Sequence, residues 1–71
     1  MKYDVSIIGA THVATCRSLK EVHKALLDAQ CVNKMTVDLV LDIADSLMTE
    51  GVYIGEMAVD RRWQYRIKVV R

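Results

Sequence analysis

The 71-residue chain contains no proline, no phenylalanine, three glycines and only two cysteines. The lack of proline and phenylalanine by itself excludes nothing. Two cysteines are too few for the disulfide framework of small secreted domains, so we expect Cys16 and Cys31 to be free thiols. No apolar run reaches the roughly 18 residues that a membrane span needs, and the N-terminus lacks a secretory signal. We therefore expect a soluble, cytoplasmic protein with no membrane contact.

Motifs that mark common enzymes are also missing. The sequence has no glycine-rich phosphate loop, no His-Glu-x-x-His motif and no nucleophile elbow. A chain of this length forms one domain, residues 1–71, with little volume for an enclosed pocket. The sequence therefore predicts a protein that is not an enzyme and needs no cofactor.

Metal ligands of suitable type are present, but their spacing is unfavourable. His12 and Cys16 are four residues apart, and His23 and Cys31 could add two more ligands. On a regular strand, His12 and Cys16 would share a face at a separation of about 13 Å, too far for one ion. We expect no metal site, and neither cysteine has an evident activating partner.

The N-terminal third predicts a hairpin and a helix. Apolar and polar residues alternate over residues 2–8, and residues 12–16 are rich in β-branched side chains, with Gly9 between the two segments. Ser18 and Glu21 form a capping box that begins a helix ending near Gln30. The apolar stripe of this helix consists of Leu19, Val22, Leu26 and Ala29.

A second helix follows, and it is the longer of the two. Thr36 is a good N-cap, and Gly51 can adopt a left-handed cap after a last turn near Glu50. Helical spacing predicts a core stripe of Val37, Val40, Leu41, Ala44, Leu47 and Met48, widened by Leu39 and Ile43.

The segments 52–59 and 61–70 predict a C-terminal hairpin, which gives the order β-β-α-α-β-β. We expect an α+β fold in which two helices cover one face of a four-stranded, mostly antiparallel sheet. An alternative comes from "SLMTEGVYIGEMAVDRRWQYRIKV", residues 46–69, which resembles the last helix and wing of a winged-helix domain. That resemblance implies a DNA-binding regulator that uses its C-terminal basic hairpin. It predicts a third helix-like element before Thr36, and helix in the first sixteen residues would favour it.

The last eleven residues hold five of the ten positive charges. If Trp63, Tyr65, Ile67 and Val69 face inward, Gln64, Arg66 and Lys68 face outward. The basic surface would consist of Arg61, Arg62, Arg66, Lys68 and Arg71. Such a ribbon could contact nucleic-acid phosphates, or it could keep a closing strand soluble. With Trp63 and Tyr65 in the core, no stacking platform for bases is expected.

The second helix carries the opposite charge. Asp38, Asp42 and Asp45 are spaced four and three apart, so they share one helix face. This row could bind a basic patch on a protein partner, or it could be an ordinary solvated face. On a DNA-reading helix, three carboxylates would have the wrong sign.

The absence of catalytic motifs and the separate acidic and basic strips favour a protein-protein interaction function. In size and composition the chain resembles the small inhibitors that phages and mobile elements encode against host machinery, anti-CRISPR proteins among them. The resemblance implies an inhibitor that occupies a partner's surface. Pairing of exposed strand edges would also allow a homodimer.

Overall fold

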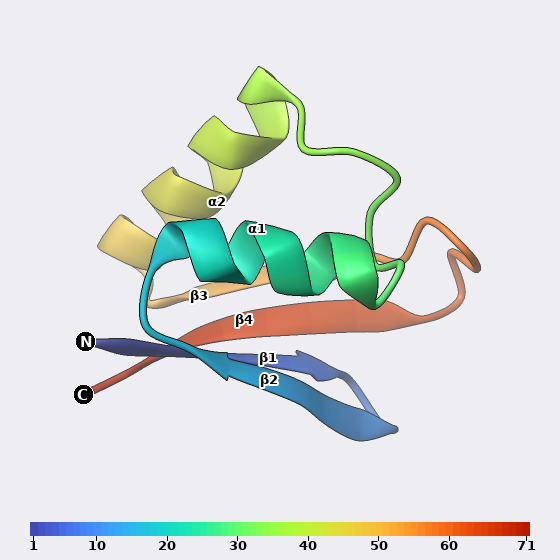
Figure 1. Ribbon diagram of the computed structural model, residues 1–71, viewed down its shortest axis with the longest axis horizontal. Coiled ribbons are helices and arrows are strands. Elements are labelled where there is room, and N and C mark those ends of the chain that lie inside the picture. The colour runs from blue at the N-terminus through green and yellow to red at the C-terminus, as the bar shows by residue number, and fades with distance from the viewer.

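The computed structural model describes residues 1–71 and contains the predicted elements in the predicted order (Figure 1). Strands β1 (Lys2–Ile7) and β2 (Thr11–Cys16) form the first hairpin, and β3 (Val52–Glu56) and β4 (Gln64–Val70) form the second. Helices α1 (Leu19–Asp28) and α2 (Val37–Thr49) lie between them in the chain. The strands form one antiparallel sheet of order β2-β1-β4-β3, so the α+β fold is confirmed.

Local signals place the helix ends where the sequence predicts them. The Ser18 hydroxyl accepts a hydrogen bond from the backbone N–H of Glu21 at 3.2 Å, and Thr36 accepts one from Leu39 at the same distance. Both bonds satisfy amides that a helix leaves free in its first turn. Gly51 has a φ of 76° and donates its N–H to carbonyls of the last turn of α2. This left-handed conformation suits glycine and ends the helix.

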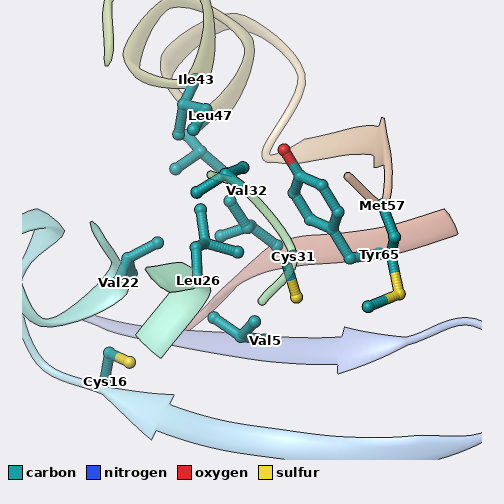
Figure 2. Packing of buried hydrophobic residues seen from close by; sticks show 11 residues of the cluster. Val5, Cys16, Val22, Leu26, Cys31, Val32, Ile43, Leu47, Met57 and Tyr65 are labelled. Carbon is teal, nitrogen blue, oxygen red and sulfur yellow. The ribbon is translucent and has the colours of Figure 1, made fainter. Parts of the chain in front are cut away.

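Both helices cover the same face of the sheet, which leaves the other face open (Figure 1). Eleven buried side chains from both layers form the core. Figure 2 shows Val22, Leu26 and Ile43 pointing from the helices toward Val5 and Tyr65 of the sheet. Apolar burial between the two layers supplies the main favourable term in folding.

The predicted core stripe of α2 is partly wrong. Ile43 and Leu47 are the buried residues of this helix, whereas Val37, Leu41 and Met48 are 74%, 60% and 84% exposed. With 100° of rotation per residue, Ile43 and Leu41 point in widely different directions, so one sheet cannot cover both. The side of α2 that faces the sheet is centred on Leu47, which belongs to the predicted stripe, and on Ile43, which the sequence places only at its margin.

The predicted position of Trp63 is also wrong. β4 begins at Gln64, and Trp63 lies before it with 47% of its surface exposed. Tyr65 and Ile67 are buried and Val69 is half-buried, as the alternation predicts. Alternation along a strand sets the face toward which a side chain points, but the side chain is buried only if the helices extend over it. Trp63 lies beyond the part of the sheet that the helices cover.

His12 and Cys16 do not share a face of β2. The register between β1 and β2 shifts at an irregularity between Val5 and Ser6, where Val5 pairs with Ala14 and Ser6 pairs with His12. Val13 is the extra residue, and a bulge of this kind reverses the direction of later side chains. Cys16 is therefore buried under the helices, whereas His12 is exposed on the open face.

The first sixteen residues contain two strands and no helix, which contradicts the winged-helix alternative. Neither of the two helices has the length and hydropathy to cross a bilayer.

Candidate functional site

The outer side of α2 carries an exposed apolar stripe, which consists of Val37, Leu41 and Met48. These residues are spaced four and seven apart, so they lie in one row along the helix. Large apolar side chains scattered singly over a surface are ordinary, whereas a contiguous group of them marks an interaction site. The stripe is therefore the first candidate binding surface.

A row of carboxylates, Asp38, Asp42 and Asp45, runs beside the apolar stripe. All three residues are exposed, and α2 contains no lysine or arginine that could neutralise them. Asp38 lies in the first turn, where the helix dipole favours a negative charge. Asp42 and Asp45 have no such compensation, and like charges at this spacing are mildly destabilising. We call the stripe and the carboxylate row together the α2 surface.

A groove of about 240 Å³ adjoins the stripe on the side away from the carboxylates. Its lining includes Tyr3, Leu19, Ala44, Leu47 and Met48, together with Arg71. Met48 belongs to both the groove and the stripe, so the apolar surface continues from α2 to the ends of β1 and β4. An apolar side chain of a partner protein could insert into this groove while neighbouring residues of the partner contact the apolar stripe.

The open face of the sheet carries positive charge along β4. Arg66 and Lys68 are exposed and lie on the face opposite the buried Tyr65 and Ile67. Lys2 lies on the same face of β1, where it pairs with Val70. Ile54 of β3 pairs with Arg66 and is 51% exposed. We call Lys2, Ile54, Arg66 and Lys68 together the sheet surface.

Two of the predicted basic residues lie apart from this surface, in the loop between β3 and β4. Arg62 donates three hydrogen bonds to the Asp60 carboxylate, from its backbone N–H at 3.0 Å, from Nε at 3.1 Å and from Nη2 at 2.9 Å. These bonds lower the pKa of Asp60 and raise the pKa of Arg62. Arg62 is thus held by its own loop, whereas Arg61 is exposed and Arg71 lies at the far end of β4.

The open face also carries negative charge, from Asp4 on the central strand β1 and from Glu56 on the edge strand β3. Thr15 Oγ1 donates to Asp4 Oδ1 at 3.1 Å and lies 3.1 Å from His12 Nε2, which is 3.8 Å from Asp4 Oδ1. Glu56 lies at the end of β3. Asp4 is also the direct cross-strand partner of Lys68, so it offsets part of the positive charge of β4. The cations Lys2, Arg66 and Lys68 outnumber the carboxylates Asp4 and Glu56, which leaves the open face a small excess of positive charge.

The residues considered as metal ligands are dispersed. Cys16 and Cys31 are free and buried, and burial raises the pKa of both thiols, which disfavours the reactive thiolate. His23 lies on α1, and its Nε2 is buried without a hydrogen-bond partner. No group of three histidine, cysteine or acidic side chains is arranged to hold an ion.

Comparison with protein-family models, with curated proteins and with solved structures finds no match to this chain.

Sequence reasoning located the aspartate row and the basic strand but missed the apolar stripe between core and carboxylates. A signal was present, because α2 has eight apolar residues among its thirteen. At three or four apolar residues in every two turns, one covered face of a helix this long needs about five to seven of them. Eight exceeds that number only slightly, so the composition of α2 was a weak signal of a second apolar side.

Proposed function

We propose that this chain is a non-enzymatic protein-binding domain whose α2 surface docks on a basic and partly apolar surface of another protein. The observation that carries the proposal is the exposure of Val37, Leu41 and Met48 in one row beside three uncompensated aspartates. Desolvation of the apolar stripe would supply affinity, and the carboxylates would speed association and select a positive partner.

Occupation of a partner's working surface would make such a domain an inhibitor, in the way that small anti-CRISPR proteins act. The resemblance to that class rests on size and composition alone. The DNA-binding alternative has weaker support, because Arg62 is held by Asp60 and α2 presents only negative charge. Exposed Trp63 removes one objection to it but provides a single aromatic ring rather than a platform.

The proposal is tested by affinity capture from nuclease-treated lysate with matched charge-reversal variants. Asp42→Lys/Asp45→Lys alters the α2 surface and leaves Asp38 at the helix start. Asp28→Lys/Glu56→Lys makes the same charge change on exposed residues outside α2. We expect a specific protein that wild type and this control capture and the Asp42→Lys/Asp45→Lys variant loses, with all three circular dichroism spectra alike. Capture that is indifferent to the α2 change would overturn the proposal.

A further inference from the structure

The α2 surface and the sheet surface are complementary in two respects. The first is apolar and negative, with Val37, Leu41 and Met48 beside the carboxylate row. The second is apolar with an excess of positive charge: exposed Ile54 lies opposite Arg66 and half-buried Val52 lies opposite Lys68. Lys2, Arg66 and Lys68 outnumber the two carboxylates of this face, Asp4 and Glu56. Each surface therefore presents what the other would need from a partner.

The two surfaces cannot meet within one molecule. The helices cover one face of the sheet (Figure 1). Arg66 and Lys68 lie on the other face, since they alternate along β4 with the buried Tyr65 and Ile67. The outer side of α2 and the open face of the sheet thus point in opposite directions. Only a second copy can bring an α2 surface against a sheet surface.

The charged rows also agree in length. From Asp38 to Asp45 the helix rises about 10 Å at 1.5 Å per residue. From Arg66 to Lys68 the strand rises about 7 Å, and Lys2 on the neighbouring strand extends the positive charge toward the end of the sheet. A helix laid along β4 could thus place its carboxylates near the cations while its apolar stripe covers Ile54.

We propose that this chain associates with itself head to tail, with the α2 surface of one copy on the sheet surface of the next. This inference rests on the proposed function, since it assigns a second copy as one occupant of the same α2 surface. The contact joins unlike surfaces, so it can repeat into a ring or an open chain. A stable interface buries about 800 Å² on each partner. That is roughly a sixth of this chain's 4913 Å². Because this is a large share for two surfaces that each consist of a few side chains, we expect a weak association that needs high protein concentration.

Sedimentation velocity of the purified chain, from dilute to millimolar and at low and high salt, tests the proposal. We expect the average mass to rise with concentration and to fall with added salt, which screens exposed charges. Two new variants each alter one surface: Leu41→Lys/Met48→Lys, called the α2 variant in this experiment, and Arg66→Glu/Lys68→Glu, called the sheet variant. Each should remain monomeric. All four residues are exposed, so we expect each variant to fold, and circular dichroism is the check.

Mixing the two variants gives the decisive result. The sheet variant keeps its α2 surface and the α2 variant keeps its sheet surface, so the mixture should form dimers although neither variant does so alone. A contact between two like surfaces would survive in one of the variants and would overturn the proposal. A wild-type chain that stays monomeric throughout would also overturn it, while partner capture through α2 would remain open to its own test.

Discussion

At the residue scale, a close contact joins Gly55 of β3 and Tyr65 of β4, which are paired across the sheet. A Cβ atom at Gly55 would lie 2.6 Å from the Tyr65 hydroxyl and 2.7 Å from its Cζ. The Tyr65 ring is buried and lies 6.1 Å from the Tyr53 ring, so it has little room to move away. The absence of a side chain at Gly55 is what allows the tyrosine to fill the core there.

We therefore expect Gly55→Ala to lower the free energy of unfolding by about 1–3 kcal/mol, the usual cost of overpacking. Urea denaturation followed by circular dichroism measures this change. Glu56→Ala, at the exposed neighbouring position, is the control and should stay within about 0.5 kcal/mol of wild type. Equal stability of the two variants would show that the ring has space to shift.

At the element scale, the orientation of α2 decides which of its apolar residues stabilise the fold and which remain free for binding. Ile43 is fully buried, and Leu41, two residues earlier, is 60% exposed. Both lie in the middle of the helix, so truncation to alanine has a similar effect on helix propensity and isolates the effect of burial.

Ile43→Ala should cost about 2–5 kcal/mol of stability, since it leaves a cavity in the core. Leu41→Ala should cost less than about 0.5 kcal/mol. Chemical denaturation of both variants under identical conditions provides the comparison. The reverse ranking would mean that α2 is rotated about its axis relative to the structure described above, and it would remove the stripe from the candidate site.

At the scale of the whole molecule, three buried acids link stability to pH. Burial raises the pKa of Cys16 and Cys31 above the ordinary 9.0 and that of Tyr65 above 10.0. Carboxylates of Glu21 and Asp4 raise the pKa of Cys16 further. The unfolded chain therefore releases these protons at a lower pH than the folded chain does, and release favours unfolding.

Near neutral pH these groups are protonated in both the folded and the unfolded chain, so they should give stability no dependence on pH there. The free energy of unfolding should then fall as pH rises through 9 and beyond 10. Urea midpoints measured from neutral pH to above 10 test this expectation. Cys31→Ala, which removes one of the buried thiols, should show a shallower alkaline decline than wild type. A midpoint independent of pH over this range would contradict the account of the buried thiols.

The order of elements, the ends of both helices and the alternation along β1 and β4 could be predicted from the sequence alone. Each of these depends on residues close together in the chain: Ser18 and Thr36 cap their own helices, and Gly51 ends α2 by its own φ. The exposed aspartate row and the outward direction of Arg66 and Lys68 were predictable for the same reason.

Only the tertiary structure decided which side of α2 is covered, where the helix layer stops short of Trp63, and how the bulge at Val13 separates His12 from Cys16. A helix that is apolar on two sides gives no local preference between them. The choice depends on which residues the sheet presents and on how the connecting loops tilt the helix against it. For the same reason, the residues of the apolar stripe, on which the proposed function depends, could not be told from the core residues of α2 until the core had been assigned.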